Sequence, residues 1–136
     1  MEEMNKAVVF QLGQEEYAVP IEFVTSIEKP HGIKLLPHLP NHIKGIVKVR
    51  DELVPVIDLE NMLYHRDIDA DDLTKIIVLH TEVLSAAILV SDAKEIIDIP
   101  NKDIKQVRLI ANQKTAYLSG IAALGSRLIT MINPSA

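Results

Sequence analysis

Two histidines in the middle of the sequence have the spacing of a metal site. His38 and His42 are four positions apart, the separation at which two imidazoles on one helix bind zinc. Pro40 lies between them and excludes that helix, because it has no backbone N–H and its ring blocks the preceding turn. We therefore expect loop histidines that face water. A small metal-dependent hydrolase that uses them is kept as the alternative to a protein without catalytic activity.

An acidic run later in the chain resembles the start of a calcium-binding loop. Asp67, Asp69 and Asp71 alternate as the first ligands of such a loop do. The loop also needs a glycine at its sixth position and a glutamate at its twelfth, where this sequence has Asp72 and Val78. We interpret the run as a solvated linker, and we expect neither a bound metal nor a cofactor.

The sequence lacks the residue patterns of nucleophilic catalysis and phosphate binding. The chain has no cysteine, and none of its serines lies in a Gly-x-Ser-x-Gly turn. Its 5 glycines are dispersed and form neither a dinucleotide-binding motif nor a P-loop. The net charge of −5, from 14 Lys and Arg against 19 Asp and Glu, argues against nucleic acid as a partner. These exclusions favour a binding module, and we expect no enzyme.

Composition and periodicity indicate a mainly β protein of one domain. Val and Ile, which are branched at Cβ and favour strands, supply 30 of the 136 residues. Pro55 is expected to place its strand at a sheet edge or at a bulge. Alternating apolar patterns between turn residues predict the following strands, most of them in hairpins: 7–12, 16–19, 43–49, 53–57, 75–80, 83–90, 117–124 and 128–132.

Short helices and loops are expected between these strands. Apolar side chains recur every three positions over residues 21–27, between Pro20 and Pro30, which predicts a short helix. Asp58 can cap a helical turn over residues 59–64. The remaining segments are interpreted as a second amphipathic stretch at 92–99 and a loop at 101–115.

The two halves of the sequence resemble each other. Without gaps, residues 45–58 align with 120–133, and Gly, Ile, Leu and Ile coincide at four positions. Upstream, each half has a hairpin and an amphipathic stretch that ends in a proline. The repetition predicts two small barrels packed together in a single domain, 1–136. We expect sub-barrels at roughly 1–66 and 74–136, with possible strand exchange between them, and a binding cleft where they meet.

Six segments, taken in order, give the sequence a recognisable pattern: 10–21, 36–40, 43–50, 54–59, 89–96 and 117–129. They resemble the CheW family of bacterial chemotaxis coupling proteins, and the resemblance covers nearly the whole chain. It implies two five-stranded SH3-like barrels with short helices. It also implies a scaffold that links the cytoplasmic tips of methyl-accepting chemotaxis receptors to the regulatory domain of the histidine kinase CheA.

Four positions match those with which the family contacts the receptor or the kinase: Val24, Gly45, Arg50 and Ile96. Each has a structural alternative. Val24 and Ile96 are equally consistent with core positions, Gly45 with a close approach of two backbones, and Arg50 with a solvated turn. We expect Val24 and Ile96 to come from corresponding stretches of the two halves and to meet one receptor helix in the cleft, through buried apolar contacts.

The sequence predicts neither a membrane-spanning segment nor a secretion signal. The longest purely apolar run has five residues, and the N-terminus has no signal-peptide pattern. We expect a cytoplasmic protein at membrane-associated receptor arrays, without membrane insertion.

The turn at 48–51 reads Lys-Val-Arg-Asp where the family usually has Asn-Leu-Arg-Gly. A CheW-like adaptor of a non-flagellar pathway, such as pilus motility, is the alternative within the same fold.

Overall fold

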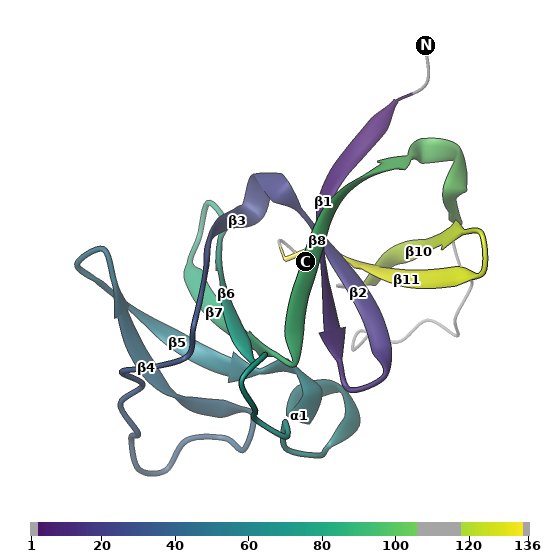
Figure 1. Ribbon diagram of the computed structural model, residues 1–136. Helices are drawn as coiled ribbons and strands as arrows, with labels where there is room; N and C mark the ends of the chain where they lie inside the picture. Colours follow the sequence, from purple (N-terminus) through teal and green to yellow (C-terminus); the bar gives the residue numbers. More distant parts are fainter. Residues whose placement is uncertain (1–2, 106–117, 135–136) are drawn as a thin grey trace.

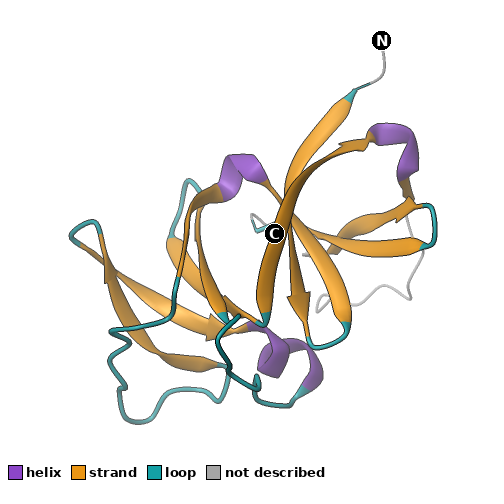
Figure 2. Cartoon of the chain, viewed as in Figure 1, coloured by secondary structure: helices purple, strands orange, loops and turns teal. Residues whose placement is uncertain are grey.

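The computed structural model describes residues 3–105 and 118–134, and its strands form two sheets (Figure 1). One sheet has the order β8(Asp92–Pro100), β1(Met4–Leu12), β2(Glu15–Pro20), β11(Arg127–Ile132), β10(Leu118–Leu124), β9(Ile104–Lys105). The other has the order β3(Val24–Glu28), β6(Lys75–His80), β7(Ser85–Val90), β5(Glu52–Asp58), β4(Ile43–Val49). Short helices join some of the strands: the 3₁₀ helices η1(Ile21–Phe23) and η2(Asn101–Asp103) and the α-helix α1(Leu59–Tyr64) (Figure 2). The expected mainly β class is confirmed.

Each sheet closes on itself because one continuous piece of chain supplies both of its edges. In the six-stranded sheet, β8 passes through η2 directly into β9, which pairs with β10. In the five-stranded sheet, the chain after β3 reaches Lys34, whose backbone bridges to Ile46 of β4. We call the five-stranded sheet barrel 1 and the six-stranded sheet barrel 2.

Sheet membership does not follow the two halves of the sequence. The first hairpin of the chain, β1–β2, pairs with β8 and, in parallel, with β11. The corresponding hairpin of the second half, β6–β7, pairs with β3 and, in parallel, with β5. Each half therefore contributes its first hairpin to the barrel that the other half completes, so strands of both halves share each barrel.

The barrels repeat the same local geometry. Gly45 in β4 has a φ of +151° and Gly120 in β10 has a φ of +154°, and the strand register shifts next to each. Ile46 bridges to Lys34, and its counterpart Ile121 pairs with Lys105. This agreement in backbone detail is what a duplicated sequence should produce.

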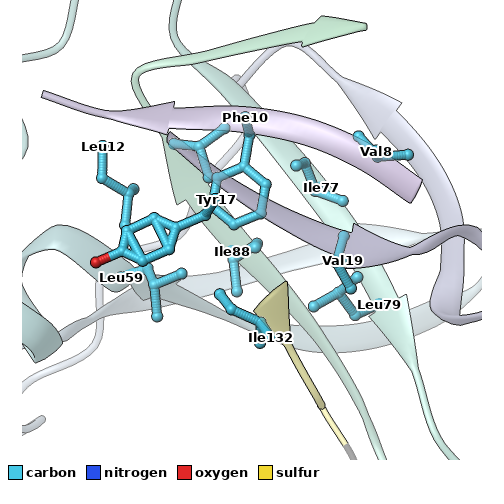
Figure 3. Packing of buried hydrophobic residues seen from close by; sticks show 11 residues of the cluster. Val8, Phe10, Leu12, Tyr17, Val19, Leu59, Ile77, Leu79, Ile88 and Ile132 are labelled. Atoms are coloured by element: carbon cyan, nitrogen blue, oxygen red, sulfur yellow. The ribbon is translucent and has the colours of Figure 1, made fainter. Parts of the chain in front are cut away.

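Among the described residues, buried apolar side chains form three clusters. Because successive side chains of a strand point to opposite faces, β1 sends Val9 into barrel 2 and Phe10 to the contact between the barrels. In the same way, β6 sends Val78 into barrel 1 and Ile77 to that contact. The cluster between the barrels, which we call the junction cluster, is shown in Figure 3 and comprises Val8, Phe10, Leu12, Tyr17, Val19, Leu59, Ile77, Leu79, Ile88, Val90 and Ile132.

The helix expected at 21–27 is wrong beyond its first turn. The structure has η1 followed directly by strand β3. The register shifts between Val24 and Ser26, so Thr25 is an extra residue in β3, a β-bulge. A bulge adds one residue to the strand, so the apolar side chains on one face are there three positions apart instead of two. This spacing resembles that of a helix. The amphipathic stretch at 92–99 is likewise a strand, β8, with an extra residue at Lys94.

Pro55 is neither at a sheet edge nor at a bulge, since β5 lies between β7 and β4. Pro55 faces Ile46, whose backbone N–H and C=O are bonded to Lys34 instead. Pairing of β5 with β7 begins only at Val56. The missing N–H of the proline therefore leaves both ladders intact, which explains why an interior strand tolerates it.

The other expected elements agree more closely with the structure. The hairpins expected at 7–19 and 117–132 are confirmed, except that residue 117 lies outside the described residues. Asp58 caps α1 by accepting a hydrogen bond from the Asn61 backbone N–H at 3.0 Å. The strand expected at 83–90 starts at Ser85, because Thr81 to Leu84 form a turn. The loop expected at 101–115 begins with η2 and β9, and 106–115 lie outside the described residues.

Candidate partner-binding surfaces

Gly45 makes a close approach of two backbones possible. A Cβ at this position would lie 2.2 Å from the carbonyl oxygen of Lys34. Across the same gap, the Ile46 N–H donates to that oxygen at 3.0 Å, and the Lys34 N–H donates to the Ile46 oxygen at 2.8 Å. Gly45 therefore allows the segment after β3 to close barrel 1 against β4, which is the structural alternative considered for it.

Arg50 lies at the exposed tip of the β4–β5 hairpin. Arg50 and Asp51 form the two-residue turn, with φ of +49° and +66°, between the paired residues Val49 and Glu52. Two positive φ values are typical of the tight turns that suit the twist of a hairpin, although glycine and asparagine are more usual there. The neighbouring Leu53 is also exposed, so the tip combines a cation with an apolar side chain.

Val24 and Ile96 both border the junction cluster, from the edge strands β3 and β8. Val24 is half-buried, pairs with Leu79 and packs against the cluster. Ile96 is 55% exposed and pairs with Val8, a member of the cluster. Paired residues of neighbouring strands point to the same face of a sheet, so Ile96 lies on the junction face of β8. Ile96 is thus a surface residue, and Val24 is partly a core residue.

The residue that corresponds to Ile96 in the other half is Ile27, which the sequence analysis missed. Both follow the bulge of their strand by two positions, and both pair with a member of the junction cluster. Ile27 is 40% exposed. Val24 instead corresponds to Ala93, which also packs against the junction cluster. When Pro30 and Pro100 are aligned, Ile96 falls opposite Ser26, so the sequence does not reveal this correspondence.

An apolar groove of about 360 Å³ lies on the junction, where the sequence predicts a binding cleft, but the residues that line it were not predicted. It lies among β2, β5, α1, β6, β7 and the end of β11, and neither Val24 nor Ile96 lines it. The sequence contained one indication of an apolar surface here. Val83 and Leu84 are adjacent apolar residues in a turn, and both side chains are exposed. The groove is lined by Val19, Ile57, Leu59, Met62, Leu79, Thr81, Leu84, Ala86, Ile88, Ile132, Asn133 and Pro134.

A buried carboxylate holds α1 and the acidic linker in place. Asp58 is fully buried and accepts hydrogen bonds from the backbone N–H groups of Asn61, at 3.0 Å, and Ile68, at 2.9 Å. Lys44 lies 3.8 Å from Asp58 and 3.0 Å from Asp67. The hydrogen bond from Lys44 lowers the pKa of Asp67 below its ordinary value. The acidic run thus has a structural anchor at Asp67.

Asp58→Asn is expected to lower the free energy of unfolding by about 2 kcal/mol, because the neutral amide keeps one acceptor and turns a donor toward a backbone N–H. Urea denaturation measures the difference. Asp67→Asn, which changes an exposed partner of the same lysine, serves as the control and should cost less than about 1 kcal/mol. Equal losses in the two variants would contradict the role assigned to the buried carboxylate.

The described residues contain no group of three or more His, Cys, Asp or Glu side chains that could hold a metal ion. In the same residues, no helix is long and apolar enough to cross a membrane. The described residues instead provide surfaces on which a partner protein could bind: an exposed hairpin tip on barrel 1, apolar edge strands at the junction, and a groove. Two packed SH3-like barrels with these features define a β-rich scaffold for protein binding.

Comparison with known proteins gives the family. Residues 6–136 match the CheW-like domain, and the chain belongs to this family. It is 28% identical to the chemotaxis protein CheW of Klebsiella aerogenes over 127 residues, which cover 93% of this chain and 76% of the relative. It is 26% identical to the chemotaxis protein CheW of Bacillus subtilis over 133 residues, which cover 97% of this chain and 85% of the relative.

A solved structure agrees with this assignment. The scaffolding protein TtCheW from Thermoanaerobacter tengcongensis superposes with a TM-score of 0.86 and 28% identity, covering 97% of this chain and 86% of that one. The protein is therefore a non-catalytic scaffold of the CheW family. The two SH3-like barrels expected from the resemblance are confirmed, but the sheet of barrel 2 has six strands where five were expected, because the two-residue strand β9 is added at its edge.

Proposed function

We propose that this protein couples methyl-accepting chemotaxis receptors to the histidine kinase CheA by binding both at once. The observation that carries the proposal is the separation of the candidate contacts. The hairpin tip with Arg50 projects from barrel 1, at the left of Figure 1, whereas β8 with Ile96 crosses the middle of the molecule. Two partners that use these surfaces do not compete for the same residues.

The junction surface suits a receptor helix. The receptor tip is a hairpin of antiparallel helices, and a helix that docks through its apolar face needs exposed apolar side chains on the surface that it meets. Ile96 and Ile27 provide such side chains on β8 and β3, and Val24 lies partly exposed beside the same cluster. The proposed contact therefore depends on apolar burial, and its affinity should change little with salt.

The hairpin tip suits the regulatory domain of the kinase. Arg50 is an exposed cation for which the described residues provide neither a hydrogen bond nor an ion pair, and Leu53 lies beside it. An arginine can donate two parallel hydrogen bonds to one carboxylate of a partner. Barrel 1 would then meet the kinase end-on, away from the receptor.

Arg50→Ala is expected to weaken kinase binding by roughly 1 to 2 kcal/mol, about tenfold in affinity, since a charge-assisted hydrogen bond is lost. The melting temperature should stay nearly unchanged, because Arg50 is exposed in its turn. Isothermal titration calorimetry against the CheA regulatory domain measures the effect, and Lys48→Ala, an exposed cation on the same hairpin, is the control. Normal binding by Arg50→Ala, or its unfolding, would remove Arg50 from the site.

Simultaneous binding is tested by a competition titration. We expect a soluble receptor-tip fragment to bind this protein with the same affinity whether or not the CheA regulatory domain is present at saturation. A receptor affinity that falls as the kinase domain is added would mean that the two surfaces overlap.

We place the protein in the cytoplasm at receptor arrays, and a fluorescent fusion that forms receptor-dependent clusters would support this location.

A further inference from the structure

We infer that Arg127 is a positioning residue, which orients the receptor-binding face of β8 by joining this strand, through Glu95, to β2 and β11. The inference rests on the function proposed above and assigns a role to a residue that does not contact the receptor. Arg127 donates from Nη2 to Glu95 at 2.7 Å and also to Glu16 at 2.8 Å, and from Nε to Glu16 at 3.2 Å. One guanidinium thus joins three strands of barrel 2.

The direction of Ile96 follows from the position of its neighbour. Glu95 pairs with Val9, whose side chain lies inside barrel 2, and Ile96 pairs with Val8, whose side chain lies in the junction. Consecutive residues of a strand point to opposite faces. The contact with Arg127 holds Glu95 on the barrel side, and this fixes the rotation of β8 that directs Ile96 toward the junction surface.

Strand β8 needs such a contact more than an interior strand does. It is an edge strand that pairs with β1, and the extra residue at Lys94 interrupts the ladder directly before Glu95. A bulge bends and twists its strand, and the interrupted ladder provides less support there. In the corresponding strand of barrel 1, Ser26 donates instead to Glu28 of the same strand at 2.7 Å. The two edge strands at the junction are therefore held in different ways.

The contact can be removed without removing the fold. Arg127 and Glu95 are both partly exposed, so their ion pair adds little to global stability. The hydrogen bonds with Glu16 and Glu95 raise the pKa of Arg127 above its already high ordinary value. Its charge is thus constant in any practical buffer, and neutral variants report on the contact itself.

The test compares Arg127→Ala and Glu95→Gln with the parent in titrations against the receptor-tip fragment and, separately, the CheA regulatory domain. We expect receptor affinity to fall by about fivefold in each variant, because both lose the charge-assisted contact between Arg127 and Glu95, and kinase affinity to change less than about twofold. In an Ile96→Ala background, Arg127→Ala should have little further effect, because both changes act on one surface. The melting temperature serves as the check on folding.

Three results would overturn the inference. Unchanged receptor affinity in Arg127→Ala would mean that β8 is positioned without the contact. An equal loss of both affinities together with a lower melting temperature would assign Arg127 a purely structural role. Full additivity with Ile96→Ala would mean that the two residues act independently. If the parent protein itself does not bind the receptor tip, the proposed function fails first, and that outcome is seen before any variant is compared.

Discussion

Ile96→Glu is expected to abolish binding of the receptor tip, with a loss of at least about a hundredfold in affinity, while the protein stays folded. Ile96 is 55% exposed on the junction face of β8, so in the free protein a carboxylate there remains in water. A bound receptor helix would cover it. Desolvation of an unpaired charge costs several kcal/mol, whereas burial of the isoleucine contributes about 1 kcal/mol.

The control for this variant is Leu128→Glu. Leu128 is an apolar strand residue of barrel 2 that is 66% exposed, and it is outside the proposed junction surface. Both variants add the same charge, so a loss confined to Ile96→Glu identifies the surface. Val24→Glu should also lose binding but should melt lower, because Val24 packs partly against the junction cluster. Normal receptor binding by Ile96→Glu, or an affinity that falls steeply with added salt, would contradict the apolar contact.

Gly45→Ala is expected to lower the free energy of unfolding by more than about 3 kcal/mol, since it combines steric overlap with backbone strain. The added Cβ would lie 2.2 Å from a backbone oxygen of Lys34, and a backbone atom cannot rotate away as a side-chain end can. The φ of +151° is also unfavourable for alanine. Urea denaturation of the parent and variant measures the loss.

Gly32→Ala is the matched control, because it separates strain from overlap. Gly32 also has a positive φ, +78°, but an added Cβ would meet no heavy atom within 4 Å. We expect a loss of about 1 kcal/mol from strain alone. If Gly45→Ala is no less stable than Gly32→Ala and yet fails to bind CheA or the receptor, Gly45 is a contact residue and not a backbone device.

The hairpins could be predicted from the sequence because each is a local object, with strands and turn in one short segment. Strand exchange between the barrels could be expected in general terms, but the hairpins that are exchanged could not be identified, because the exchange depends on parallel pairings such as Ile57 with Ile88 between distant segments. Strands β1 and β6 are buried on both faces, so Ala7 to Phe10 are buried without alternation. A continuous apolar run does not indicate which side chain faces which cluster.

Whether a single candidate side chain is exposed or buried could not be predicted from the sequence either. The sequence could name Val24 and Ile96 but left surface and core equally open, because exposure depends on the register with Leu79 and Val8. A bulge in each strand changes that register, and nothing in the residue types at Thr25 marks it. Arg127 was not considered as a candidate, since its carboxylate partner on β8 is 32 residues away in the sequence.

The central claim, two partners on two separate surfaces, is tested most directly by sedimentation of receptor-containing membranes with purified CheA. We expect CheA to appear in the pellet to a much greater extent when this protein is present. Arg50→Ala should leave the protein in the pellet but reduce the amount of CheA that sediments with it, whereas Ile96→Glu should leave both in the supernatant. CheA that sediments equally without the protein, or two variants that release the same components, would contradict the claim.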